Sequence, residues 1–524
     1  MTARARQNPL DRYTNIGELS EKVRFATKRV IAPLVLVLGI ETAYLGLSGH
    51  PGAGAFALIS AGTCLALLVW SQGGIGLPLL PTLIIQNLII YGVPIAAGHE
   101  AINAYPPDFV FSAGTEVLIF EIALAVAWRA GMQVFSPSPP ASYALHEFNR
   151  AGAKGWARLG FTMVTGATAF LVLQGLDLLG AFYAVMPSGS DSILYALVAV
   201  VSACGFFLIA LIIGGKEASL LEKVVFWALL IGNAMMSASD FLLSSAAANL
   251  ITVAIGFFWS GGRVPWRYLT VAMLALSFLN TGKTTMRTRY WGTDDAPASH
   301  RTFEQLPACY AEWIEVSYNA ILENDTAKTQ ATSENTVQAN KNQTLLDRID
   351  NLQNLLFVID AVQTDHIKPL EGKTYSLIPP LLVPRILWPD KPRSHEGQIL
   401  LNVHFGRQDL ESTFTTYIAW GLLPEAYGNF GPVTGSVCLG LFIGALFAWI
   451  ENLTARKLLV SMEGFLSLSL LMNLMNSFEM VASVLVTSTF QSFVVIIAAS
   501  MPFVHRTVTQ RPEPDENRAM DDGP

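Results

Sequence analysis

The chain has 524 residues, of which 52% are apolar and 14% are charged, and its mean hydropathy is +0.42. Soluble domains carry about 25% charged residues, so this composition lacks the polar surface that a globular protein needs in water. It excludes a soluble enzyme, a disordered protein and a disulfide-stabilised scaffold. The net charge of −7 says little about partners, because in a membrane protein the distribution of charge between the two faces matters more than its sum.

Apolar stretches long enough to cross a bilayer recur along the chain, since about 20 residues at about 1.5 Å each span the hydrocarbon layer. This pattern predicts an all-α polytopic integral membrane protein. The apolar run at 224–260 fits either one or two membrane crossings. With two crossings, the basic residues that follow it lie on the cytoplasmic side, so we expect two. About twelve transmembrane helices are then expected, at 30–48, 54–70, 75–97, 110–127, 159–181, 192–214, 224–238, 241–259, 268–280, 433–450, 458–477 and 481–503.

Basic residues set the predicted orientation, because Lys and Arg collect in cytoplasmic loops. Residues 1–29 carry seven of them and are expected to form a basic cytoplasmic N-terminus. Alternate threading then makes 504–524 a disordered cytoplasmic tail. It also leaves one large external insert, residues 281–432, between an N-terminal bundle at 30–280 and C-terminal helices at 433–503.

The insert is the place where function is expected to concentrate, because the other external loops are short. Apolar residues at helical spacing predict an amphipathic helix at 344–362, which lies on the membrane or packs on the bundle. The apolar segment 375–387 contains three prolines. We therefore expect a re-entrant or interfacial segment there and not a regular span.

The most informative stretch of the insert runs from 383 to 431. It places Arg385, Lys391 and Arg393 around a proline-rich turn that carries Trp388. Cations held together in this way form an anion site, and guanidinium groups suit phosphate oxygens. The same residues also fit membrane anchors, with Trp388 in the interfacial aromatic belt and Arg385 reaching lipid headgroups.

Two segments of this stretch resemble a known family. PR-x-x-WP-x-KP at 384–392 and PE-x-Y-x-NFG at 424–431, just before an apolar span, are similar to the oligosaccharide repeat-unit polymerases of the Wzy-type O-antigen group. The resemblance implies a glycosyltransferase of the bacterial inner membrane with a GT-C-like architecture. On the periplasmic face it would transfer a glycan from a polyprenyl-diphosphate carrier to the non-reducing end of another carrier-linked unit.

The resemblance also implies partners. The substrate would be a polyprenyl-diphosphate-linked oligosaccharide in contact with membrane lipid, and polymerases of this group usually work beside a regulator of chain length. We expect no nucleic acid, no cofactor and no metal. In the absence of a metal, the anionic charge left on the diphosphate must be met by Arg and Lys.

Roles can be assigned to the residues that match this chemistry. The catalytic candidates are Glu425, Arg385 and His395, although Glu425 equally fits an acid favoured by the dipole of the following helix. The sugar-binding candidates are Tyr427, Asn429 and Trp388. The diphosphate-binding candidates are Arg385, Lys391, Arg393 and Arg407, with a second basic cluster after the 268–280 span at Lys283, Arg287 and Arg289.

Two other functions stay open. One is an O-antigen ligase-like glycosyltransferase with the same donor, and the other is a transporter of lipid-linked oligosaccharide. Acids inside the predicted spans are functional candidates by default, but the spans hold almost no Lys, Arg or His to partner them in proton coupling. We expect these acids to pair with hydroxyls or with amides such as Gln86 and Asn87. The acids within the predicted spans are Glu41, Glu116, Glu121, Asp177, Asp240 and Glu463.

Overall fold

The computed structural model describes most of the chain. Three predicted functional residues, Arg385, Asp177 and Asp240, lie outside the described part. The described residues are 15–137, 143–176, 178–180, 190–216, 218–239, 241, 243–260, 264–290, 303–330, 350–383, 387–388, 390–393, 395–415, 418–457, 462–476, 480–500 and 504–506.

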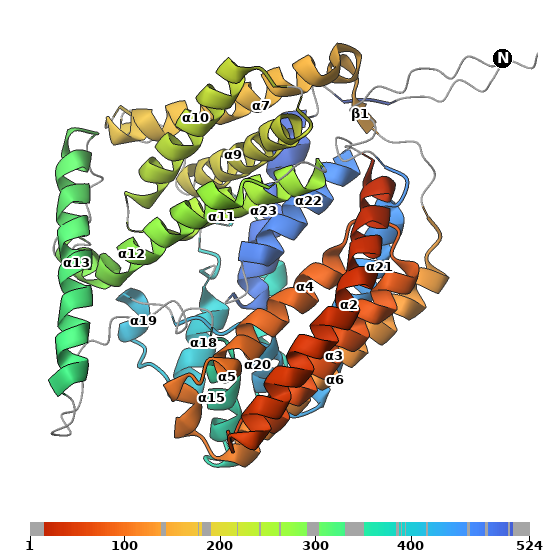
Figure 1. Cartoon of the computed structure of the whole chain (residues 1–524), viewed down its shortest axis with the longest axis vertical. Helices are drawn as coiled ribbons and strands as arrows, with labels where there is room; N and C mark the ends of the chain where they lie inside the picture. Colours follow the sequence, from red (N-terminus) through yellow and green to blue (C-terminus); the bar gives the residue numbers. More distant parts are fainter. Residues whose placement is uncertain are drawn as a thin grey trace, which may run out of the picture.

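Helices make up nearly all of this part (Figure 1). The N-terminal bundle contains α2 (Ile16–Leu47), α3 (Ala53–Gly73), α4 (Leu79–Asn87), the π-helical turn η1 (Leu88–Gly92), α5 (Val93–Ala96), the 3-10 turn η2 (Glu100–Ala104), α6 (Pro107–Val134), α7 (His146–Gly175), α9 (Ser190–Gly214), α10 (Leu220–Ala238), α11 (Leu243–Trp259) and α12 (Trp266–Tyr290). The insert contains η3 (Phe303–Gln305), α13 (Leu306–Gln330), α15 (Leu352–Gln363), α16 (Lys373–Ser376), α17 (Ile378–Leu382), α18 (Glu396–His404), α19 (Ser412–Thr415) and α20 (Leu422–Phe430). The C-terminal helices are α21 (Thr434–Thr454), α22 (Met462–Asn476) and α23 (Ala482–Ser500).

A helix lies at each of the twelve predicted span positions. Within the described residues, eight helices are long and apolar enough to cross a membrane: Ile16–Leu47, Ala53–Gly73, Leu79–Ala96, Pro107–Val134, Ala157–Gly175, Leu197–Gly214, Leu220–Ala238 and Thr434–Thr454. The apolar parts of α11, α22 and α23 are 10 to 17 residues long, and α12 ends in a basic turn. The helical membrane protein is therefore confirmed, whereas the number twelve stays a prediction.

Helix and strand bounds differ from the predicted segment bounds at three places. Helix α2 begins at Ile16, inside the segment 1–29, because Asn15 caps it by accepting from Gly17 N at 2.9 Å. The boundary at 280 falls within α12, where helix-forming Lys, Met and Arg carry the helix on to Tyr290. The tail expected to be disordered from 504 begins with strand β2 (Val504–Arg506), because its backbone pairs antiparallel with β1 (Tyr143–Leu145).

Segments that alternate threading places on one side of the membrane meet in the structure. Ile16 N donates to Lys457 O at 3.2 Å, and β1 pairs with β2. At the opposite end of the bundle, Asn351 N donates to Ile90 O at 3.1 Å. These contacts agree with the predicted order of the spans.

Helices α6 and α21 pack backbone against backbone. Gly440 and Gly444 lie four residues apart on α21 and face the carbonyl oxygens of Phe120 and Leu124 on α6. A Cβ at either glycine would collide with that backbone, so only glycine permits this approach. Small residues at such spacing are typical of helix pairs in membranes, where dispersion and close contact replace the hydrophobic effect.

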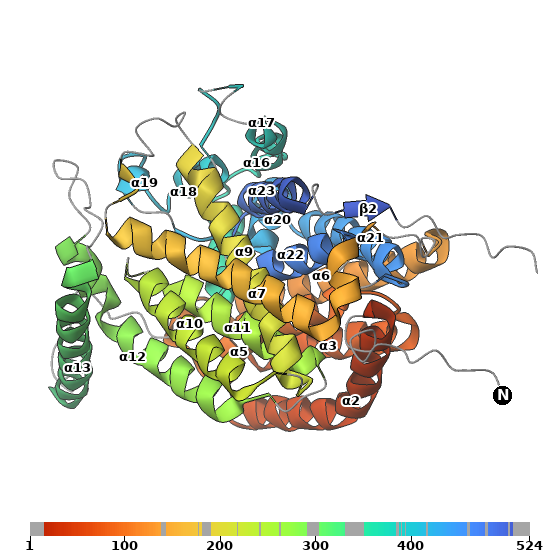
Figure 2. The ribbon, with the colours of Figure 1, turned by 90° about the horizontal axis from the view of Figure 1, so that it is seen from above.

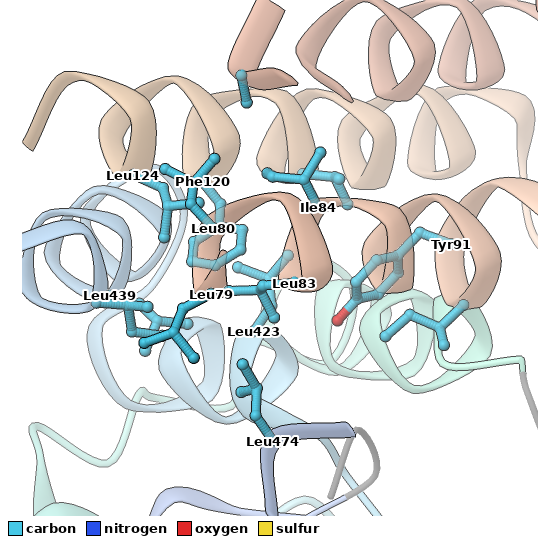
Figure 3. Packing of buried hydrophobic residues seen from close by; sticks show 14 of the residues in the cluster. Leu79, Leu80, Leu83, Ile84, Tyr91, Phe120, Leu124, Leu423, Leu439 and Leu474 are labelled. Atoms are coloured by element: carbon cyan, nitrogen blue, oxygen red, sulfur yellow. The ribbon is translucent and has the colours of Figure 1, made fainter. Parts of the chain in front are cut away.

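Helix α4 lies in the centre of the core and connects the bundle with the insert. Figure 3 shows Leu79, Leu80 and Leu83 of α4 surrounded by side chains of α6, α20, α21 and α22. Leu423 of α20 is 2% exposed within this cluster, so the helix that carries Glu425 is anchored on the membrane bundle. Helix α15 is also buried, and of its two expected positions it takes the one on the bundle.

The glycine contact predicts opposite effects for one substitution at two sites. Alanine generally stabilises a helix by up to about 1 kcal/mol relative to glycine, so Gly232→Ala, where the added Cβ meets nothing within 4 Å, should be neutral or stabilising. Gly444→Ala should lower the free energy of unfolding by about 1–3 kcal/mol through overpacking. Thermal unfolding of the two purified variants checks this, and equal midpoints would contradict it.

Candidate functional site

Both motif segments connect to α23, the second directly and the first through α17. Glu425 of α20 reaches the first turn of α23 from one side, since its Oε2 accepts from Ala482 N at 2.5 Å. The first turn of α18, which begins one residue after His395, reaches it from another side. A Cβ at Gly397 would lie only 2.9 Å from Ser483 Oγ, so α18 and α23 approach closely there.

Lys391 connects the first motif to the same place. Its Nζ donates to Leu381 O at 2.8 Å and to Val383 O at 2.6 Å. These carbonyls lie at the end of α17, where a cation is favoured by the helix dipole. Because α17 packs on α23, Lys391 and Glu425 are both linked to α23 although 34 residues separate them in the sequence.

Glu425 is the centre of a buried polar network. Thr374 of α16 donates to its Oε1 at 2.6 Å, and Asn429 Nδ2 donates to Thr374 Oγ1 at 2.9 Å and to Glu425 O at 2.8 Å. The Glu425 residue is 0% exposed. The bond to Ala482 N satisfies one of the donors that every helix N-terminus leaves without an intrahelical partner.

Burial raises the pKa of Glu425 to about 7, against the bonds from Thr374 and Ala482 that favour the charged form. The carboxyl group can therefore exchange its proton near neutral pH. Its two oxygens are occupied and it has no exposed surface, so a sugar hydroxyl cannot reach it in this structure. A general base must come within hydrogen-bond distance of its substrate, and a positioning role fits this geometry better.

Two of the three predicted sugar-binding residues are also internal. Asn429 is 0% exposed, and Tyr427 is 1% exposed with its hydroxyl accepting from Gln363 Nε2 at 3.4 Å. Trp388 is 43% exposed. Of these three side chains, only the indole offers a surface on which a sugar ring could stack.

The exposed part of the candidate site is the segment 388–395. Arg393 is exposed and His395 is half-buried, with its Nδ1 bonded to Gln398 Oε1 at 2.7 Å. Cation, imidazole and indole groups thus gather beside the first turn of α18. The motif 424–431 supplies the buried support, and 388–395 supplies the surface that a ligand can touch.

Arg407 lies in the core of the insert. Its guanidinium carbon is 5.1 Å from the ring centre of Phe357 and 5.9 Å from that of Trp420, and Nη1 donates to Ala419 O at 3.4 Å. Burial lowers its pKa to about 10. These contacts with aromatic faces give Arg407 a packing role that its charge pattern did not suggest.

The second basic cluster forms the last two turns of α12. Lys283 is 3% exposed, Arg287 Nη2 donates to Phe241 O at 3.0 Å, and Arg289 pairs with Glu312 of α13 at 2.8 Å. These contacts tie the cluster to the end of α10 and to α13. Figures 1 and 2 place α12 and α13 at an edge of the molecule, apart from α20 and α23.

Two of the six acids within the predicted spans, Glu116 and Glu121, bond to hydroxyl or amide groups as expected, whereas Glu463 pairs with a lysine. Glu116 of α6 accepts from Val433 N at 2.9 Å and from the Ser436 hydroxyl, at the start of α21. Glu121 meets Asn87 and Thr63, both at 3.5 Å.

Two acids near the other end of the bundle are also paired. Glu463 pairs with Lys457 at 3.2 Å. Glu451, which the sequence reasoning missed because the predicted span ended at 450, accepts from Trp70 Nε1 at 2.6 Å. Such pairing is what makes an acid tolerable at membrane depth.

A buried hydrogen bond between His99 and Asp350, which the sequence reasoning missed, docks the insert on the bundle. His99 Nδ1 lies 2.6 Å from Asp350 Oδ2, and Asn351 Nδ2 donates to Tyr91 OH at 3.2 Å. Burial raises the pKa of Asp350. Asp350 also accepts from Gln353 N at 3.0 Å, and an acid just before an apolar helix is an N-cap signal that could have been found in the sequence.

The cavity between the bundle and α20 is too small to bind a sugar. It measures about 30 Å³ and is lined by residues that include Gln86, Tyr91 and Leu423. That is room for a water molecule or two. Within the described residues, no group of three or more His, Cys, Asp or Glu side chains is placed to hold a metal ion.

No protein-family model, no curated protein and no solved structure matches this chain.

The raised pKa of Glu425 predicts a stability that depends on pH. Its folded-state pKa of about 7 lies above the ordinary 4.5, so the stabilisation is complete below about pH 4.5 and is lost as the pH rises through about 7. The loss approaches about 3 kcal/mol at about 1.4 kcal/mol per unit. Glu425→Gln should flatten this dependence, whereas Glu411→Gln, at an exposed carboxyl, should keep it. Unfolding midpoints at about pH 5 and pH 8 measure the difference, and identical profiles for all three proteins would contradict it.

Proposed function

We propose that the chain is a membrane glycosyltransferase that polymerises carrier-linked glycans. In this proposal it lies in a bacterial inner membrane with both termini in the cytoplasm. The insert and the helix ends beneath it form a GT-C-like active face in the periplasm. The substrate is an oligosaccharide on a polyprenyl diphosphate, and the product is a longer chain on a second carrier.

The observation that supports the proposal is that both motif segments connect to the same helix, α23. Glu425 of the second motif binds Ala482 N at 2.5 Å. Lys391 of the first motif binds the end of α17, which packs on the same helix. Segments that share one functional site are expected to converge in this way, whereas anchors that act separately at the membrane surface have no reason to do so.

The exposed residues beside α23 suit the chemistry. Transfer breaks the bond between the anomeric carbon and the diphosphate oxygen, and the diphosphate leaves with the electron pair. Lys391 and Arg393, together with Arg385 of the same segment, would stabilise that charge. The acceptor hydroxyl oxygen forms the new bond, and His395 would take its proton, with Gln398 orienting the imidazole ring.

The buried network has a different role in this proposal. Glu425, Thr374 and Asn429 hold α16, α20 and α23 together beneath the exposed segment. They are positioning residues that keep Lys391 and His395 in register with the bound carrier. Such preorganisation matters because a displacement of about 1 Å at a reacting centre can cost about a hundredfold in rate.

The polymerase proposal predicts a loss of polymer in defined variants. In the native strain deleted for this chain, surface polysaccharide should shrink to single repeat units. Arg385→Ala and His395→Gln should fail to restore the ladder of lengths, because they lack the diphosphate contact and the proton acceptor. Lys368→Ala, at an exposed lysine of the same insert, should restore it. Gel electrophoresis of the polysaccharide, at equal membrane abundance of the variants, reads the result.

The other outcomes separate the alternatives. A ladder that persists after deletion excludes the polymerase. Loss of all attached glycan, single units included, indicates instead the ligase or the transporter of lipid-linked oligosaccharide. Restoration of the ladder by both variants would leave the chain a polymerase candidate with its site elsewhere.

A further inference from the structure

Helix α13 has three distinct faces over residues 306–322. One face is buried against α12 and the end of α10, with Trp313 Nε1 donating to Leu279 O at 2.8 Å. A second face is apolar and exposed, and a third is polar. The buried face consists of Cys309, Trp313, Ser317 and Ala320, the apolar face of Ile314, Tyr318, Ile321 and Leu322, and the polar face of Glu312, Glu315 and Asn319.

The apolar face is unusual for a helix outside the predicted spans. Its residues follow the spacing of three and four that puts side chains on one side of a helix. Ile314 is 52% exposed, Tyr318 is 57% exposed and Ile321 is 38% exposed. A contiguous exposed apolar stripe of this kind marks contact with a membrane or another protein.

Contacts at one edge of this face favour the membrane. Tyr310, at the border between the buried and apolar faces, donates its hydroxyl to Met235 O of α10 at 2.6 Å. Helix α10 is one of the eight candidate spans, and Val224, Ile231 and Met235 form its own exposed stripe, 58%, 59% and 48% exposed. The apolar face of α13 therefore continues the lipid-facing surface of a transmembrane helix.

The polar face of α13 makes contacts with charged and polar groups, as expected of a side that faces water. Glu312 accepts from Arg289 Nη1 at 2.8 Å and from the Tyr290 hydroxyl, at the basic end of α12. A helix with protein on one side, lipid on the second and charged groups on the third is suited to the membrane interface. Figure 2 shows α13 at the rim of the molecule.

We propose that α13 is an interfacial membrane helix. Its face of Ile314, Tyr318, Ile321 and Leu322 lies in the lipid beside α10, and its polar face lies toward the headgroups and water. The helix thereby fixes the start of the insert, and the basic end of α12, at the level of the membrane surface. This inference does not depend on the proposed polymerase activity.

Two adjacent residues test it, because they lie on different faces of the same turn. The full chain with Tyr318→Cys or Asn319→Cys is labelled with a nitroxide and placed in lipid nanodiscs, and chain without an added cysteine gives the background. Collision with oxygen, which concentrates in lipid, should exceed collision with a water-soluble nickel chelate several-fold at position 318. At position 319 the preference should reverse.

Two results would overturn the proposal. Equal preference for the nickel chelate at both positions would show that the face lies in water. Dipolar broadening between labels at position 318, lost when the protein is diluted with unlabelled chains, would show a second copy seated on the face. Ile314→Cys and Glu315→Cys repeat the comparison one turn earlier, so a local disturbance at one position cannot decide the outcome.

Discussion

The fold depends on one constraint: the N–H groups in the first turn of a buried helix must find hydrogen-bond acceptors. These groups have no intrahelical partner, and in a bilayer no water reaches them. Carboxylates from other helices supply the acceptors here. Glu116 of α6 meets the start of α21, and Glu425 of α20 meets the start of α23. Each bond satisfies a helix and fixes the position of one element against another.

This arrangement assigns the two sequence motifs different parts of one site. In the second motif, Glu425 is buried and both of its carboxyl oxygens are hydrogen-bonded within the protein. Its neighbours Tyr427 and Asn429 are also buried. In the described part of the first motif, Trp388 is exposed and Lys391 is half-buried, and Arg393 directly after the motif is exposed. Because burial keeps the pKa of Glu425 at about 7, the link between α20 and α23 responds to pH in the range where a proton-transfer site would also work.

The insert is held by four separate attachments. Glycine contacts hold α21 close to α6 at the exit of the insert, and Leu423 anchors α20 in the core beside α4. The hydrogen bond of His99 with Asp350 fixes the start of α15 beside the start of η2. Helix α13 packs on α10 and α12 at the entrance of the insert. The candidate site therefore lies on a rigid support, as reaction geometry requires.

The sequence by itself determined the helical membrane fold and the positions of twelve helices, because apolar length is a local property. It also predicted that acids within the spans meet hydroxyl or amide groups, but the partner Asn87 of Glu121 was decided by the tertiary structure. The sequence identified Glu425 as either a base or a helix-terminal acid. Only the tertiary structure showed that Glu425 binds the N-terminus of α23, through Ala482 N, which lies 57 residues away in the sequence. It likewise placed Lys391 on the end of α17 and Arg407 on Phe357 and Trp420. Periodicity shows which face of a helix is buried, but the partner of a polar group depends on which helix ends the fold brings together.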